Sequence, residues 1–289
     1  MIDLETFAEA VGAVGEVAVQ GHGTRGGAPV GVRTVSPPSG IQQVQPDEMT
    51  VCCAAATPVD ELVAALAEHR QTVALPAGGT VGGALAVGRA DVRRLGWGPV
   101  RDVLLQARYV SAEGRVVKVG GPTVKNVSGF DLCRLLVGSR GALGFVGEVL
   151  LRTRPMARAS QWFVAADVDA SRLGDVQRRL YRPTSLLWNG QSLWALLEGH
   201  PADVAEQARA AQLVESDGPP ELPSGGRWSV PPSAVASLQG TFVAEVGVGV
   251  VHHVDAAPAQ RRDHRVVALA AAVKRELDPT GRLNPGVEM

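Results

Sequence analysis

The sequence is poor in cysteine. Its three cysteines, Cys52, Cys53 and Cys133, are odd in number, and no two of them have CxxC spacing. This argues against a disulfide framework, a zinc site or a set of iron–sulfur ligands. The pattern predicts small core residues in a reducing compartment, and we expect no metal site.

Long apolar runs and an excess of charge are also missing. No apolar stretch reaches the roughly 18 residues that a membrane-spanning helix needs, so we expect no transmembrane segment. Met1 leads into the acidic stretch IDLETF, which does not resemble a signal peptide. The formal net charge of −1 gives no reason to expect nucleic acid as a partner. We therefore expect a cytoplasmic protein, with peripheral attachment to a membrane complex left open.

The familiar nucleotide fingerprints are absent or out of context. There is no Walker A motif. Gly21–Gly26 matches G-x-G-x-x-G, but the next segment, GAPVGVRTVSPPSG, holds three prolines and has no helical period. In a dinucleotide-binding βαβ unit that motif should open a helix, so the sequence does not predict a Rossmann fold.

What the first half does contain is strands that break into glycine loops. Residues 4–14 predict an amphipathic helix. The strand MTVCCAAAT leads into a second helix, for which Thr57 is the expected N-cap and Pro58 the first helical residue. Two extended runs around Ala112–Gly114 predict a hairpin.

The pattern changes after Pro155. The elements that follow read β-α-β-β-α-β, the order of a ferredoxin-like domain, and Asn189–Gly190 predicts a hairpin between two of these strands. We therefore predict an α+β protein with a first domain at 1–155 and a ferredoxin-like cap at 156–289. The final helix and tail of the cap are expected to return toward the first domain.

Three glycine loops follow strands in the first domain: QGHGTRGG, PAGGTVGG and GSRGALG. Glycine lets backbone N–H groups approach a ligand, and successive N–H groups form concave anion sites that suit a pyrophosphate. A tight turn is the alternative explanation for any one of these loops. Three of them in one domain favour a binding site.

These loops, together with VKNVSGFDLCRLLVGSRGALGFVGEV and the terminal GRLNPG, resemble the vanillyl-alcohol-oxidase/p-cresol-methylhydroxylase flavoproteins, and among them the FAD-binding subunits of glycolate oxidases. The resemblance covers nearly the whole chain. It implies a PCMH-type FAD-binding domain of two subdomains with FAD extended between them. The sequence departs from the family in a short second glycine loop and in Arg140, where relatives usually have an apolar residue.

The resemblance also implies which residues hold the cofactor. FAD is expected to be non-covalent, because His22 lacks the spacing of a covalently linked histidine. The implied cofactor-binding residues are Gly21, His22, Gly23, Thr24, Arg25, Gly78, Gly79, Thr80, Gly82, Gly83, Lys125, Asn126, Val127, Ser128, Gly129, Asp131, Gly141, Gly144, Phe145 and Val146. Arg282 and Asn284 of the terminal motif are expected to hydrogen-bond the domain junction, with a minor contact to the flavin as the alternative.

Three residues are candidates for catalysis. Lys125 could place a cation near the flavin N1 region, or form an ion pair that holds its loop. His252 and His253 end an apolar strand and could serve as a base. Because neighbouring residues on a strand face opposite ways, at most one of the two could enter a site. A half-exposed structural pair is the alternative.

The function implied by the resemblance is FAD-dependent oxidation of a small 2-hydroxy acid, most plausibly glycolate, with a hydride passing to flavin N5. Electrons would then pass to partners, a larger FAD-binding subunit and an iron–sulfur subunit of a glycolate oxidase complex. Two alternatives stay open. One is a non-catalytic FAD-carrying or assembly subunit, and the other is a stand-alone D-lactate-type dehydrogenase.

Overall fold

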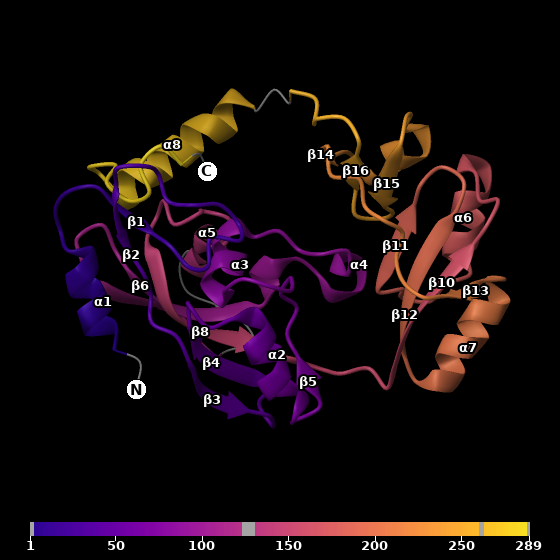
Figure 1. Ribbon diagram of the computed structural model, residues 1–289, viewed down its shortest axis with the longest axis horizontal. Coiled ribbons are helices and arrows are strands. Elements are labelled where there is room, and N and C mark those ends of the chain that lie inside the picture. Colours follow the sequence, from indigo (N-terminus) through magenta and orange to yellow (C-terminus); the bar gives the residue numbers. More distant parts are fainter. Residues whose placement is uncertain (1–2, 123–130, 260–262, 288–289) are drawn as a thin grey trace. The chain divides into compact units, whose positions relative to one another are not determined.

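The computed structural model describes residues 3–122, 131–259 and 263–287 of the chain. Helices and sheets are mixed, and the chain divides into two compact units (Figure 1). The first unit comprises Met1–Asp91, Pro99–Met156 and Arg262–Met289, and the second comprises Val92–Gly98 and Ala157–Arg261. The last segment of the chain thus belongs to the first unit, whereas the predicted cap range of 156–289 included it.

A five-stranded antiparallel sheet forms the centre of the first unit, in the order β3-β4-β8-β6-β7. Its strands are β3 (Ile41–Gln45), β4 (Thr50–Ala54), β6 (Leu104–Val110), β7 (Val116–Gly120) and β8 (Phe145–Arg152). The predicted hairpin around Ala112–Gly114 is confirmed by the pairing of β6 with β7. Short helices pack their apolar residues on this sheet: α2 (Val59–Ala67), α3 (Val81–Val87) and α5 (Leu132–Leu136).

The first unit has a second, smaller layer. Helix α1 (Leu4–Val11) packs with the parallel pair β1 (Val17–Val19) and β2 (Arg33–Val35) around a core that includes Phe145. The Asp3 side chain accepts a hydrogen bond from the Thr6 N–H and so caps α1. The helix ends at Val11, earlier than predicted, because Gly12 follows with a φ of 61°.

The predicted cap of α2 was wrong. Pro58, with extended backbone, is the N-cap and makes no side-chain capping bond. The Thr57 hydroxyl instead accepts from the Gly40 N–H and donates to the Gly40 carbonyl. A partner distant in sequence therefore replaces the local cap. The remaining elements of this unit are β5 (Gln71–Thr72), which pairs with β9 (Arg154–Pro155), the 3-10 turn η1 (Val100–Asp102) and α8 (His264–Leu277).

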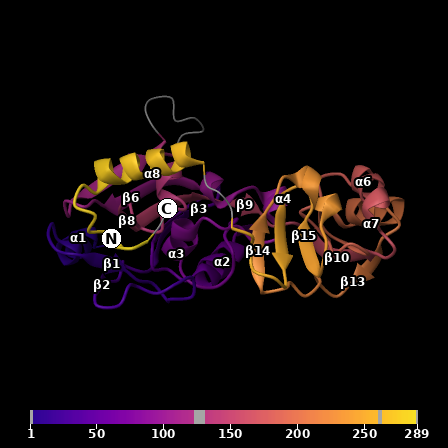
Figure 2. The ribbon, with the colours of Figure 1, turned by 90° about the horizontal axis from the view of Figure 1, so that it is seen from above.

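Helix α8 belongs to the first unit because its C-terminal half is apolar on the side that meets the sheet. Val273 and Leu277 pack against the core cluster that includes Leu62 and Leu151. Figure 2 shows α8 running along this unit. None of the described helices is long and apolar enough to cross a membrane.

The second unit is built on a seven-stranded antiparallel sheet, ordered β13-β10-β12-β11-β15-β16-β14. Its elements are α4 (Arg94–Trp97), β10 (Ala159–Ala165), α6 (Ala170–Arg178), β11 (Ser185–Trp188), β12 (Leu193–Gly199), α7 (Pro201–Ala210), β13 (Val214–Ser216), β14 (Gly226–Ser229), η2 (Pro232–Ser237), β15 (Phe242–Glu245) and β16 (Val250–His253). Residues of α6 and α7 contribute to the apolar core on this sheet. The Asn189–Gly190 hairpin is confirmed by the pairing of β11 with β12.

The element order of this unit begins as predicted. Elements β10, α6, β11, β12 and α7 follow the predicted β-α-β-β-α order, but the strand that comes next, β13 at Val214–Ser216, was not predicted. The predicted last strand, TFVAEVGVGVVHHV, forms β15 and β16, which with β14 enlarge the sheet on the β11 side. The segment 92–98 joins this unit because the Gly96 N–H donates to the Thr184 carbonyl and the Trp97 indole donates to Glu198. The sequence did not indicate that segment.

Candidate cofactor-binding site

A cleft in the first unit collects most of the predicted cofactor-binding residues. It holds about 1070 Å³ of empty space, including solvent at its open mouth. The walls come from the loop after β1, the start of α3, the loop before β8 and the tail after α8. Among the described residues that line it are Arg25 and Arg140, and none is an aspartate or glutamate. The lining therefore suits an anionic ligand.

Arg25 links two of the glycine loops. Its Nη2 donates to the carbonyls of Pro76 (3.1 Å) and Ala77 (3.0 Å), which precede the second loop. Its Nη1 is buried and has no hydrogen-bond partner. Burial lowers the pKa of the guanidinium, and the nearby Asp60 carboxylate opposes that effect. A buried cationic donor without a partner is costly unless an acceptor, such as a phosphate oxygen, completes its bonds.

The glycines of the second loop serve close packing between loops. A Cβ on Gly79 would lie 2.2 Å from Arg25 Nη1 and 2.4 Å from Thr24 Oγ1, and the φ of Gly79 is 64°. A Cβ on Gly82 would lie 2.8 Å from the Cβ of Ala55. Thr80 caps α3 by accepting from the Gly83 N–H at 3.1 Å. These glycines therefore hold the walls of the cleft together.

Three glycines of the first loop have open space beside them, whereas a Cβ on the fourth, Gly21, would lie 2.8 Å from the Thr80 hydroxyl. A Cβ on Gly26 or Gly27 would meet nothing within 4 Å, and one on Gly23 would meet only the Gln20 side chain at 3.7 Å. All three line the cleft. The first loop is thus the part of the backbone that a ligand can approach closely.

The loop before β8 is fixed from behind. The Phe145 side chain is fully buried in the core shared with α1 and β1, so only its backbone can face a ligand. A Cβ on Gly144 would strike the Tyr109 ring, and one on Gly141 would strike the side-chain amide of Asn284. The third loop therefore also uses its glycines to pack against other parts of the protein.

The structure brings together twelve of the predicted cofactor-binding residues at the cleft lining: Gly21, His22, Gly23, Thr24, Arg25, Thr80, Gly82, Gly83, Gly141, Gly144, Phe145 and Val146. Gly78 and Gly79 lie outside that lining. Lys125, Asn126, Val127, Ser128 and Gly129 lie outside the described residues. Asp131 is the N-cap of α5, where it accepts from the Arg134 N–H and pairs with the Arg134 guanidinium at 2.9 Å.

Other lining residues were not predicted as cofactor contacts. They include Gln20, Ala55, Ser139 and Val287; Asn284, for which a minor flavin contact was the alternative, also lines the cleft. Asn284 belongs to the terminal motif GRLNPG, which was expected to hydrogen-bond a domain junction. Its hydrogen bonds instead go to residues of the first unit, Val19 and Arg140. Only the motif itself could have marked this residue, because its partners lie far away in sequence.

The two histidines lie on β16 in the second unit and face opposite sides of the sheet. His253 is buried and stacks on Trp228, with ring centroids 3.9 Å apart. Its Nδ1 accepts from the Asp255 N–H at 2.9 Å, so Nε2 carries the proton that bonds the Gln239 carbonyl at 3.1 Å. Both ring nitrogens of His253 are therefore used in structure.

His252 is less enclosed. Its Nε2 lies 3.1 Å from Oε1 of Glu245, a carboxylate that is 2% exposed and whose Oε2 has no hydrogen-bond partner. A carboxylate that holds one imidazole nitrogen fixes the ring and leaves the other nitrogen to exchange a proton. Of the two histidines, His252 is the one with the chemistry of a base.

Comparison with known proteins finds a likeness for the N-terminal part of the first unit, which supplies two of the walls of the cleft. Residues 7–120 match the family described as an FAD binding domain. This match spans less than half of the chain. The cofactor of that domain is FAD, and three features of the cleft fit it: the anion-compatible lining, the unpartnered buried donor on Arg25 and the open glycine backbone of the first loop.

Curated relatives extend the likeness. The chain is 33% identical over 173 residues to glycolate oxidase subunit GlcE of Escherichia coli, which covers 57% of this chain and 49% of the relative. It is 31% identical over 145 residues to glycolate oxidase subunit GlcD of Bacillus subtilis, covering 48% of this chain and 31% of the relative. A D-lactate dehydrogenase of Archaeoglobus fulgidus is 35% identical over 119 residues, covering 40% and 27%. The chain thus spans about half or less of the length of these relatives.

Solved structures extend the likeness to the whole fold. One structure of alkyldihydroxyacetonephosphate synthase matches 98% of this chain and 73% of its own, with a TM-score of 0.68 and 13% sequence identity. At that identity the match shows a likeness of fold alone.

Proposed function

We propose that the chain is the FAD-binding subunit of a complex that oxidises a small 2-hydroxy acid, with glycolate as the first candidate. The observation that carries this is the cleft of the first unit, where glycine backbone and Arg25 meet without an opposing carboxylate among the described lining residues. The likeness to glycolate oxidase subunits supports the choice of substrate.

The residues of this chain would hold FAD without a covalent bond. The first glycine loop offers N–H groups to the diphosphate, and Arg25 offers charge. Bound FAD supplies the acceptor for the hydride that leaves the substrate carbon. Lys125 remains the candidate cation near the flavin. His252, held by Glu245, remains the candidate that takes the hydroxyl proton, while His253 is committed to structural bonds.

Electrons would leave the chain through partner subunits. Cys53 and Cys133 are buried, and burial raises the pKa of Cys133 to about 11 and that of Cys52 to about 11. The sequence has three cysteines, two of them adjacent, whereas an ordinary iron–sulfur cluster is held by four thiolates. The proposed partners are therefore a larger FAD-binding subunit and an iron–sulfur subunit, with the complex in the cytoplasm or peripheral at a membrane.

Two alternative functions are each supported by one observation. A non-catalytic FAD-carrying role is favoured by the internal bonding of His253, which removes one of the candidate bases. A stand-alone D-lactate-type dehydrogenase is favoured by the likeness to the Archaeoglobus fulgidus enzyme.

Anaerobic mixing of the FAD-loaded chain with glycolate or D-lactate separates these functions. Loss of flavin absorbance with glycolate only when the partner subunits are present supports the subunit proposal. Rapid loss with D-lactate in the isolated chain would establish the stand-alone dehydrogenase. A chain whose flavin responds to neither substrate, while the partners alone react fully, would be a carrier or assembly subunit.

A further inference from the structure

The tail that follows α8 forms part of the cofactor cleft. We call residues Asp278–Val287 the C-terminal tail, and two of them, Asn284 and Val287, line the cleft. Asn284 has a φ of 44°, in the left-handed region that asparagine tolerates better than most residues. This backbone conformation is unusual for a residue other than glycine, and it is held in place by the bonds of the tail.

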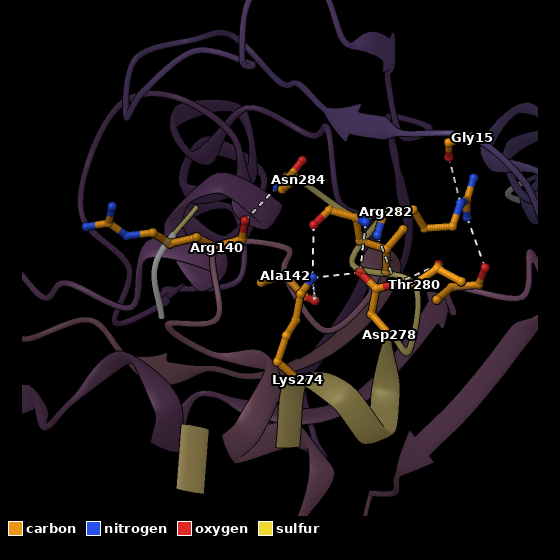
Figure 3. Close-up of polar contacts among 10 residues, drawn as sticks. Gly15, Arg140, Ala142, Lys274, Asp278, Thr280, Arg282 and Asn284 are labelled. Atoms are coloured by element: carbon orange, nitrogen blue, oxygen red, sulfur yellow. Dashed lines mark hydrogen bonds and ion pairs between the residues drawn. The ribbon is translucent and has the colours of Figure 1, made fainter. Parts of the chain in front are cut away.

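The Asn284 side chain joins two walls of the cleft. Its Oδ1 accepts from the Val19 N–H at 2.9 Å, at the end of β1 and just before the first glycine loop. Its Nδ2 donates to the Arg140 carbonyl at 2.6 Å, in the loop that leads into β8 (Figure 3). One amide thus satisfies a donor from one wall and an acceptor from the other, and so sets the spacing between them.

The backbone at Asn284 is fixed as well. Its N–H donates to the Val17 carbonyl at 2.9 Å, and Leu283 forms a bridge with Val17. The Cα of Gly141 lies so close to the Asn284 amide that a Cβ there would be 2.6 Å from Nδ2. The amide is therefore confined on three sides, and its two hydrogen bonds have little freedom to adjust.

The rest of the tail is anchored away from the cleft. The Arg282 guanidinium donates to the backbone carbonyls of residues 11, 12, 14, 15 and 112 (Figure 3). The buried Asp278 carboxylate accepts from Lys274 Nζ at 2.6 Å and from the Leu283 N–H at 2.8 Å. Burial of Asp278 raises its pKa, but the bonds from Lys274 and from the backbone outweigh burial and lower it. Asn284 is thus presented to the cleft from an anchored segment.

We propose that Asn284 is a positioning residue for the cofactor: it holds the first glycine loop and the loop before β8 at the spacing that FAD needs. This rests on the proposed binding of FAD in the same cleft. Bound FAD that bridges the two walls would stabilise the hydrogen bonds of Asn284 to both of them. Because such coupling is reciprocal, these hydrogen bonds would in turn strengthen the binding of FAD.

The test compares Asn284→Gly with a control in the same tail. Glycine keeps the positive φ and removes both side-chain bonds. Arg282→Lys weakens the anchor without touching a residue that lines the cleft. Binding of FAD to the apoprotein is followed by quenching of flavin fluorescence, at a temperature where circular dichroism shows each variant folded.

The expected result is a rise of about tenfold in the FAD dissociation constant of Asn284→Gly, the order expected from the loss of one or two hydrogen bonds. Arg282→Lys should lower the melting temperature and leave the dissociation constant within about twofold of the wild type. An unchanged constant for Asn284→Gly, or equal weakening in both variants, would overturn the positioning role. Failure of the wild type itself to bind FAD would refute the proposed function instead.

A second measurement covers the case in which Asn284→Gly does not fold. Hydrogen exchange of the wild-type chain is followed with and without FAD. The Val19 amide, which donates to Asn284, and the amides of the tail should exchange more slowly when FAD is bound. Equal exchange at these amides in the two states would overturn the proposal.

Discussion

Replacement of Arg282 by methionine should destabilise the first unit strongly. The guanidinium is 4% exposed and donates to five backbone carbonyls. Nε bonds Gly15 at 2.7 Å, Nη1 bonds Gly12 at 3.1 Å and Ala112 at 3.0 Å, and Nη2 bonds Val11 at 2.8 Å and Val14 at 3.2 Å. One side chain thus joins the segment after α1, the hairpin between β6 and β7, and the C-terminal tail.

The magnitude follows from two opposing contributions. Hydrogen bonds to a charged group contribute about 1.5–3 kcal/mol each, but the values do not add when one group makes them all. Removal of the cation also removes its desolvation cost, and burial does lower the pKa of Arg282, with Arg33 acting in the same direction. We expect a net loss of about 3 kcal/mol in the free energy of unfolding, or roughly 6–12 °C in the melting temperature.

The assay is equilibrium unfolding in urea, followed by circular dichroism, alongside a thermal scan. Arg275→Met is the matched control, because Arg275 is an exposed arginine on α8, less than one helical turn before the tail. It should change the free energy of unfolding by no more than about 0.5 kcal/mol. A loss below about 1 kcal/mol for Arg282→Met would show that the five bonds do not anchor the tail.

Three further outcomes are expected. Arg25→Met should weaken FAD binding by about tenfold or more in a fluorescence titration. Arg89→Met, at an exposed arginine outside the cleft lining, is the control and should leave the affinity unchanged. Equal affinities of the two variants for FAD would show that Arg25 does not bind the cofactor. Gly79→Ala should reduce the FAD content of the purified protein more than Gly78→Ala. Both glycines have positive φ, but only a Cβ at Gly79 would meet other atoms within 4 Å. Equal losses of FAD in the two variants would argue against a steric cause. The folded-state pKa of Asp278 is lowered, so the stability that its carboxylate contributes is complete above about pH 4 and is lost as the pH falls through that lowered value. Asp278→Asn should therefore make the free energy of unfolding depend less on pH in the acid range. An unchanged acid dependence would contradict this.

Local patterns in the sequence predicted local structure well. The hairpins at Ala112–Gly114 and Asn189–Gly190 depend on turn chemistry within a few residues, and both are present. The N-cap predicted at Thr57 failed because the hydroxyl found a better-placed partner in Gly40, which a pattern of neighbours cannot reveal.

The sequence pointed to loops that the structure gathers at one cleft, but it said less about the role of each residue. The sequence indicated the glycine loops, but it could not separate glycines that face open space, such as Gly26, from glycines that pack against another loop, such as Gly82. That distinction depends on contacts between distant segments. Asn284 is the clearest case, because it bonds Val19 across 265 positions of the chain. A single sequence carries no signal for such a pair.

The most direct test of the account is the identity of the flavin bound to the purified protein. The chain is saturated with FAD and freed of excess, its absorbance spectrum is recorded, and acid precipitation is followed by chromatography of the supernatant. We expect about one FAD per chain, released in full by acid, as non-covalent binding in a diphosphate-holding cleft requires. No retained flavin, preference for FMN over FAD, or flavin that stays with the precipitated protein would contradict the assignment of the cleft.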